Sequence, residues 1–163
     1  VSEAAKTLIE RVGIYLPEDS TETVTQAYIF ADACHTGQER KTGDPYIVHP
    51  LETALFLADL HLDAHTIVAA LLHDVVEDCG VTLEEITERF GPEVSKLVDG
   101  VTKLTNLQLN STETKQAENF RKLFMAMSKD LRVILVSHRL YSKVTGFQLS
   151  GNESATRVPD FSL

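Results

Sequence analysis

The chain has 163 residues, with 15 Lys and Arg against 24 Asp and Glu, and its formal net charge is −9. This length suits one domain, and the acidic balance argues against binding to DNA or RNA polymers, which relies on clustered basic side chains. No apolar stretch approaches the roughly 20 residues of a membrane helix, and no signal peptide is apparent. The two cysteines match no disulfide framework or Cys-x-x-Cys motif, which favours a reducing cytoplasm.

The spacing of apolar residues is helical in the first third of the chain. It predicts a helix over residues 2–12, which Pro17 ends. Asp19 or Ser20 is then expected to cap a second helix that continues to about residue 35. A loop with two glycines and a proline covers residues 36–49. Pro50 is expected to take the first position of a helix over 50–60, which leaves His49 at the rim of the loop.

Helical patterns continue up to residue 136. Asp63 is expected to cap a helix over 63–78, and Thr82 with Glu85 forms a capping-box pattern that opens a short helix to Phe90. Pro92 is expected to open a helix to about residue 104, and a long amphipathic helix is predicted over 112–136. The predicted fold class is therefore all-α, a helical bundle.

The most informative segment is His73-Asp74-Val75-Val76-Glu77-Asp78, which follows the apolar run over residues 66–72. Residues four apart share one face of a helix, so Glu77 is expected one turn beyond His73, and Asp78 one turn beyond Asp74. The two later acids also fall in the last turn before Gly80, where the helix dipole disfavours anions by roughly 0.3–1 kcal/mol each. A divalent metal ion would offset both the crowding of acidic side chains beside His73 and their unfavourable interaction with the helix dipole.

A purely structural interpretation of this segment is also open. His73 and Asp74 would then form a buried hydrogen-bonded pair, while Glu77 and Asp78 reach solvent. His49 weakens that interpretation, because two imidazoles and an aspartate make a mixed nitrogen and oxygen site. Such ligands suit manganese, iron or zinc better than calcium or magnesium.

Five ordered segments of the sequence carry a family resemblance. They are residues 35–50 (His-Thr-Gly-Gln-Glu-Arg-Lys-Thr-Gly-Asp-Pro-Tyr-Ile-Val-His-Pro), 69–78 (Ala-Ala-Leu-Leu-His-Asp-Val-Val-Glu-Asp), 90–94, 100–104 and 120–136. Together they resemble the hydrolase domain of the RelA/SpoT family, within the HD superfamily of metal-dependent phosphohydrolases. The resemblance implies an HD-domain helical bundle that removes the 3′-pyrophosphate from the stringent-response alarmones ppGpp and pppGpp. Its usual metal is manganese (Mn²⁺), with another divalent metal as the alternative.

The resemblance also implies roles for individual residues. The implied metal ligands are His49, His73 and Asp74. The implied acidic pair, which handles the attacking water, is Glu77 and Asp78. The implied nucleotide-facing loop is Arg40, Lys41 and Thr42. These roles suit the side chains, because a carboxylate can accept a proton and a guanidinium can stack on a base or bind phosphate. Without the resemblance, a solvated surface turn would explain the Arg-Lys pair equally well.

The resemblance ends at Val136. The family continues with Lys-Leu-Ala-Asp-Arg-Leu-His-Asn, whose aspartate completes the metal site and whose asparagine faces the nucleotide. This chain has Leu140 and Val144 at those two positions, and neither side chain can take over the role. His138 could replace the aspartate only after a two-residue slip, which turns a helical side chain by about 200°. We therefore expect an incomplete hydrolase domain over 1–136, a divergent, irregular tail over 137–163 in place of the family's C-terminal helices, and impaired hydrolysis.

Two other functions stay open from the sequence. One is an HD phosphohydrolase that acts on another nucleotide, which the Arg-Lys-Thr-Gly-Asp-Pro-Tyr segment makes less favourable. The other is a non-catalytic module that binds nucleotide or regulates a partner. Nothing matches the synthetase domain of the long family members, so pyrophosphate transfer from ATP is not expected. The sequence indicates no oligomeric state.

Overall fold

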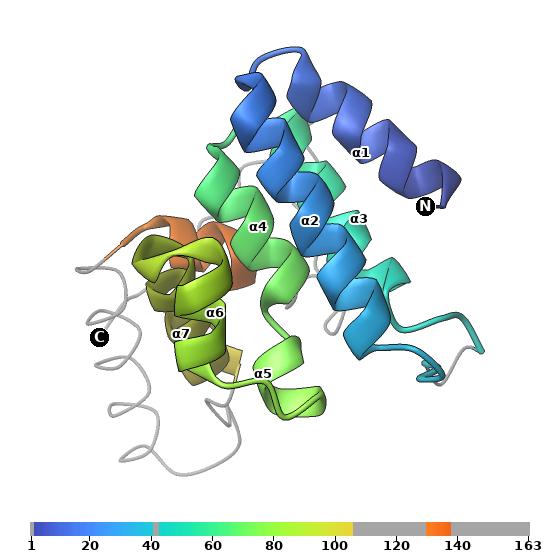
Figure 1. The fold of residues 1–163 in the computed structure, drawn as a ribbon, viewed down its shortest axis with the longest axis vertical. Helices are drawn as coiled ribbons and strands as arrows, with labels where there is room; N and C mark the ends of the chain where they lie inside the picture. Colours follow the sequence, from blue (N-terminus) through green and yellow to red (C-terminus); the bar gives the residue numbers. More distant parts are fainter. Residues whose placement is uncertain (1, 41–42, 106–129, 138–163) are drawn as a thin grey trace, which may run out of the picture.

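The computed structural model describes residues 2–40, 43–105 and 130–137 of the chain. Within these ranges the structure consists of helices and connecting loops, and its only β pairing is a single bridge between Glu39 and Pro45 (Figure 1). The helices are α1 (Glu3–Gly13), α2 (Glu18–Cys34), α3 (Val48–Asp59), α4 (Ala64–Leu72), α5 (Val75–Asp78), α6 (Leu83–Phe90) and α7 (Pro92–Thr105), followed by a helical segment over 132–137. The all-α prediction is confirmed.

Helix α4 lies at the centre of the bundle. Every residue from Thr66 to Leu72 is buried, as expected for a helix that is apolar on all sides. Helices α2, α3 and α7 pack against it, α1 covers α2 and α3, and α6 packs on α7 (Figure 1). The residues that directly follow α4, His73 and Asp74, are therefore anchored by the most completely buried helix.

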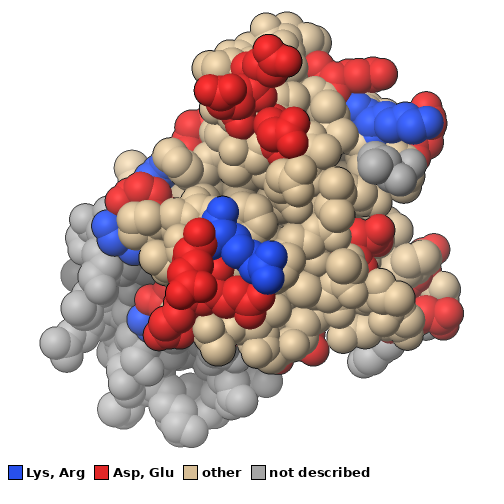
Figure 2. Space-filling model, viewed as in Figure 1, with Lys and Arg blue, Asp and Glu red and all other residues tan. Residues whose placement is uncertain are grey.

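Charged side chains lie on the outside of this bundle. On the face shown in Figure 2, Lys and Arg stand beside Asp and Glu rather than in a continuous basic patch. Several of these neighbours are ion pairs within one helix, such as Arg89 with Glu85 and Lys96 with Glu93. Each such exposed pair contributes about 0–1 kcal/mol, so the buried face of each helix dominates its stability.

Two of the predicted helix caps are confirmed. The Asp63 carboxylate accepts a hydrogen bond from the Thr66 N–H at 3.3 Å, and the Thr82 hydroxyl accepts one from the Glu85 N–H at 3.2 Å. The predicted cap of α2 at Asp19 or Ser20 is wrong, because this helix already begins at Glu18 and no side chain caps it. Pro17 precedes it in an extended conformation, and the acidic first turn of α2 suits the positive end of the helix dipole.

Helix α3 begins two residues earlier than predicted. The Val48 N–H donates to the Pro45 carbonyl and the His49 N–H to the Tyr46 carbonyl, each at 3.1 Å, so the chain turns before Pro50. Pro50 fits the third helical position because N–H groups in a first turn have no partner within the helix. His49 therefore lies in the first turn of α3 and not at the rim of the loop.

The single helix predicted over 63–78 is interrupted at His73 and Asp74. The Nδ1 atom of His73 lies 2.7 Å from the Ala70 carbonyl oxygen, which in an unbroken helix would accept the Asp74 N–H. The side chain has taken the backbone acceptor, and the helix ends there. A new helical turn, α5, begins at once, because the Asp78 N–H donates to the Asp74 carbonyl at 2.8 Å.

The long helix predicted over 112–136 falls mostly outside the described residues, which resume at Asp130. Asp130 itself is not helical, and a new helical segment follows it, so the prediction of an unbroken helix to Val136 is wrong at this point. The Asp130 carboxylate accepts a hydrogen bond from the Arg132 N–H at 2.9 Å, as a helix-capping side chain does.

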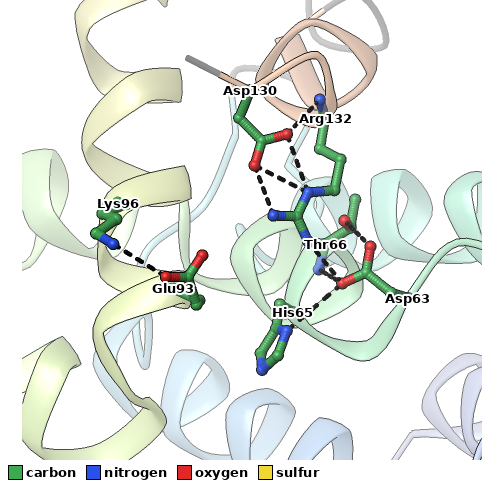
Figure 3. Close-up of polar contacts among 7 residues, drawn as sticks. All are labelled: Asp63, His65, Thr66, Glu93, Lys96, Asp130 and Arg132. Carbon is green, nitrogen blue, oxygen red and sulfur yellow. Dashed lines mark hydrogen bonds and ion pairs between the residues drawn. The ribbon is translucent and has the colours of Figure 1, made fainter.

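Arg132 connects this last segment to the beginning of α4. Its Nη1 lies 3.0 Å from Asp63 Oδ1, while its Nε and Nη2 donate to the Asp130 carboxylate (Figure 3). Asp63 thus accepts hydrogen bonds from both the α4 backbone and a residue 69 positions later in the chain. This network fixes the 132–137 segment against the central helix.

The Arg132 network should depend on pH. Burial would raise the pKa of Asp63, but hydrogen bonds from Thr66 and the charge of Arg132 outweigh it and lower that pKa. The hydrogen bond from Arg132 likewise lowers the pKa of Asp130. Both folded-state values are depressed, so this stabilisation is present above the unfolded Asp pKa of about 3.9 and is lost as pH falls through the folded values. We expect Arg132→Met to lower the free energy of unfolding by about 1 kcal/mol near pH 7, and by clearly less below about pH 3. Urea unfolding at both pH values measures this, and an equal loss at both would contradict it.

The 132–137 segment also packs closely on α7 at Gly100. A Cβ atom at this position would lie 2.8 Å from Cγ2 of Val133, whose buried β-branched side chain has little freedom to rotate. Gly100→Ala would gain up to about 1 kcal/mol in helix propensity but lose about 1–3 kcal/mol by overpacking, so we expect a net loss of stability. The control is Gly13→Ala in α1, where nothing lies within 4 Å and a gain is expected. Equal gains in thermal unfolding at both positions would exclude the tight contact.

Candidate metal site

His49, His73 and Asp74 converge at one point of the bundle. Their potential ligand atoms all lie within 4.8 Å of one another, and both imidazoles are buried. The two rings are 5.4 Å apart between centroids and inclined by 74°. The first turn of α3 supplies His49, and the turn after α4 supplies the other two. The predicted convergence of these three side chains is confirmed.

The ring of His73 is oriented by the backbone. Its Nδ1 must carry a proton to hydrogen-bond the Ala70 carbonyl, so in the neutral ring the lone pair is on Nε2. Nε2 lies 3.0 Å from Asp74 Oδ1, yet the two atoms do not form an aligned hydrogen bond, and the His73 side chain is only 1% exposed. In the neutral ring two lone pairs would face each other in a buried place and repel, so a proton on Nε2 or a metal cation shared between the two atoms makes the contact favourable. Histidine ligands of metals commonly donate their second N–H to a carbonyl in this way, so the residues fit a metal ion.

The charges of the site also favour a cation. Burial alone would lower the pKa of His73, but the neighbouring Asp74 carboxylate outweighs burial and raises that pKa. Burial would raise the pKa of Asp74, but His73, His49 and a hydrogen bond from Tyr46 outweigh it and hold that pKa below its usual value. Asp74 is therefore an anion near neutral pH, which is the form that binds metal.

Sequence reasoning assigned no role to Tyr46 or His35, although both lie in the family-like segment over 35–50. The Tyr46 hydroxyl donates to Asp74 Oδ2 at 3.1 Å. The imidazole of His35 stacks on the Tyr46 ring, with 4.6 Å between centroids and 22° between planes. The only sequence signal for a role of these two residues was their position within that segment. The contact between residues 46 and 74 depends on the tertiary fold and has no local sequence pattern.

The predicted acidic pair lies in α5, beside the cluster but outside it. Both Glu77 and Asp78 are exposed, as the structural interpretation of the motif also expects. Their charges still reach the site. Glu77 contributes to the raised pKa of His73, and Asp78 contributes, after burial, to the raised pKa of Tyr46. A water molecule close to the three clustered side chains would therefore be near this pair, although the role of the pair stays a prediction.

Of the predicted nucleotide-facing loop, the structure describes Arg40 but not Lys41 or Thr42. The Arg40 N–H donates to the Asp44 carbonyl at 2.9 Å, and the Gly43 N–H returns to the Arg40 carbonyl at 2.8 Å, which makes a narrow loop before Tyr46. The substituted positions of the tail, Leu140 and Val144, also lie outside the described residues, as does His138.

Comparison with known proteins identifies the family. Residues 27–158 match the HD domain family. The chain belongs to this family. The match crosses the boundary expected after Val136, and the predicted HD-domain bundle is confirmed.

Curated relatives narrow the similarity to the RelA/SpoT group, as predicted. The chain is 51% identical over 129 residues to a GTP pyrophosphokinase rsh of Brucella melitensis biotype 1. It is 50% identical over 122 residues to a guanosine-3′,5′-bis(diphosphate) 3′-pyrophosphohydrolase of Vibrio cholerae serotype O1, and 47% identical over 131 residues to the bifunctional (p)ppGpp synthase/hydrolase SpoT of Escherichia coli strain K12. These alignments cover 75–80% of this chain but only 17–19% of the relatives' lengths.

None of the helices in the described ranges combines the length and the apolar character that a membrane span requires.

Proposed function

We propose that this chain carries a metal-dependent hydrolase site for the 3′-pyrophosphate of ppGpp and pppGpp, with Mn²⁺ as its metal. The observation that carries the proposal is the convergence of His49, His73 and Asp74, with His73 Nε2 only 3.0 Å from Asp74 Oδ1. The names of the Vibrio cholerae and Escherichia coli relatives support the substrate and the reaction. Two free thiols, Cys34 and Cys79, support a place in a reducing cytoplasm.

The proposed roles follow from the chemistry of the side chains. His49, His73 and Asp74 would hold the metal ion, which when bound supplies positive charge that makes water more acidic near neutral pH. Glu77 and Asp78, exposed beside the cluster, would orient the attacking water and accept its proton. The nucleotide would lie against the loop of Arg40, Lys41 and Thr42, where a guanidinium and an ammonium meet base and phosphates. The mixture of imidazole and carboxylate ligands supports manganese over magnesium or calcium.

The proposal is tested by pyrophosphate release from ppGpp in the presence of Mn²⁺. Release is expected from the unmodified chain at a rate far below that of a version with the complete family C-terminus, and its loss is expected in His73→Ala. The matched control is His65→Ala, because that side chain is 56% exposed at the start of α4. Release from another nucleotide but not from ppGpp would favour an HD phosphohydrolase of different specificity. Nucleotide binding without any release would favour a non-catalytic module.

The acidic pair can be tested separately from the metal ligands. In a version of the chain with the complete family C-terminus, Glu77→Gln combined with Asp78→Asn should reduce turnover by about 100-fold or more, since positioned proton acceptors contribute 10²–10⁴-fold. Metal content should stay near normal, because the amides leave the three clustered ligands unchanged. The control, Glu84→Gln with Glu88→Gln, removes the same charge from exposed positions of α6. Metal loss together with turnover loss would make the pair ligands or structural supports, and unchanged turnover would remove it from the mechanism.

A further inference from the structure

Tyr46 contacts both sequence segments that form the candidate metal site. Its hydroxyl donates to Asp74 Oδ2 at 3.1 Å, across 28 positions of sequence. Its carbonyl accepts the His49 N–H at 3.1 Å, in the turn that leads into α3. Its own N–H donates to the Gln38 carbonyl at 3.0 Å, so the backbone of this residue is fixed on both sides. One residue thus joins the helix that carries His49 to the side chain of Asp74.

The ring of Tyr46 is fixed as well. His35, only 3% exposed, stacks on it at 4.6 Å, and His35 Nδ1 lies 2.8 Å from Gln38 Oε1 and 3.4 Å from Cys79 Sγ. The His35 ring, at the end of α2, is therefore held by Gln38 and by Cys79, which follows α5, and it supports the Tyr46 ring in turn. A hydroxyl on a ring held in this way has little freedom to move away from Asp74.

The two oxygens of Asp74 have different partners. Oδ2 accepts from Tyr46, and Oδ1 faces His73 Nε2 at 3.0 Å. The terminal torsion of an aspartate is broad and nearly two-fold, so the carboxylate by itself does not select one oxygen for a ligand. A fixed hydrogen-bond donor on Oδ2 makes this choice. It occupies Oδ2 and leaves Oδ1 available as a ligand beside the two imidazoles.

We propose that Tyr46 is a positioning residue of the metal site, which holds Asp74 so that Oδ1 is presented to the metal ion beside His73. The inference rests on the proposed function, because it requires a metal ion at this cluster. A phenol has an ordinary pKa of about 10, so near neutral pH Tyr46 keeps its proton and remains a donor to Asp74. In this role Tyr46 acts on the metal ion through Asp74.

The test compares two hydroxyl deletions in the unmodified chain, Tyr46→Phe and Tyr15→Phe. Tyr15 is a matched control, because its partly buried hydroxyl donates to the Leu62 carbonyl at 3.0 Å, in a contact between the loop after α1 and the loop after α3. Both variants keep the aromatic ring and lose one hydrogen bond. Binding of Mn²⁺ alone is followed by electron paramagnetic resonance, and thermal unfolding is measured without metal.

We expect Tyr46→Phe to weaken Mn²⁺ binding by about 10–100-fold, which is typical when a partner of a metal ligand is removed. Tyr15→Phe should retain the affinity of the unmodified chain, although both variants lose a similar amount of thermal stability. Unchanged affinity in Tyr46→Phe would overturn the positioning role, and so would equal losses of affinity in the two variants. Absence of Mn²⁺ binding in the unmodified chain is a separate result. It would overturn the proposed metal site and this inference with it.

Discussion

Leu71→Ala is expected to lower the free energy of unfolding by about 2–5 kcal/mol, the largest loss of stability that we predict for a single substitution in this chain. Leu71 is fully buried in α4, which α2, α3 and α7 surround. The cost includes the transfer of the lost methyl and methylene groups and the cavity that they leave. A central helix packed on several sides gives the neighbours little opportunity to close that cavity, so we expect a value in the upper half of the range.

The effect should extend from stability to the metal site, because α4 positions His73. Urea unfolding measures the stability, and Mn²⁺ binding at a temperature where the variant is still folded measures the site. Leu60→Ala is the control, because that side chain is 50% exposed at the end of α3 and should change stability by less than about 0.5 kcal/mol. A loss below about 1 kcal/mol at Leu71 would mean that α4 is not the centre of the core.

Much of the fold follows from local sequence. The apolar run over residues 66–72 indicated a buried helix, and the capping side chains of Asp63 and Thr82 were evident because a cap needs only residues within one turn. The three clustered side chains were also predictable. An imidazole and a carboxylate at the end of a buried helix are costly without a cation, and His49 offered a second imidazole.

Two of the errors share a physical cause, which is that local groups provide or take backbone hydrogen-bond acceptors in a way that the apolar pattern does not reveal. The interruption after α4 arises because the His73 ring takes the Ala70 carbonyl. The early start of α3 arises because Pro45 and Tyr46 already provide acceptors for the next turn. The contact of Tyr46 with Asp74 is even harder to predict from the sequence, since it joins a loop and a turn that only the packed bundle brings together.

The second large effect concerns the divergent tail. We predict that replacing residues 137–163 with the family segment Lys-Leu-Ala-Asp-Arg-Leu-His-Asn, together with the helices that follow it in the family, will strengthen Mn²⁺ binding by at least about 10–100-fold. His49, His73 and Asp74 supply only one negative charge toward a divalent ion. The family aspartate, which Leu140 replaces here, would add a second charge and a further geometric constraint. Loss of outer partners of metal ligands alone costs about 10–100-fold in affinity or activity, so loss of a ligand should cost at least as much.

Pyrophosphate release from ppGpp should rise in the same comparison, because metal occupancy and the geometry at the reacting phosphate both improve. The decisive control is the same chimera with leucine kept at position 140, which separates the missing ligand from the rest of the tail. If only the aspartate-containing chimera gains metal and activity, the substitution at Leu140 alone accounts for the impairment. A gain in both chimeras would assign the deficit to other positions of the tail. Equal metal content and equal rates in the chimera and the unmodified chain would show that the tail is harmless, with His138 or water completing the coordination.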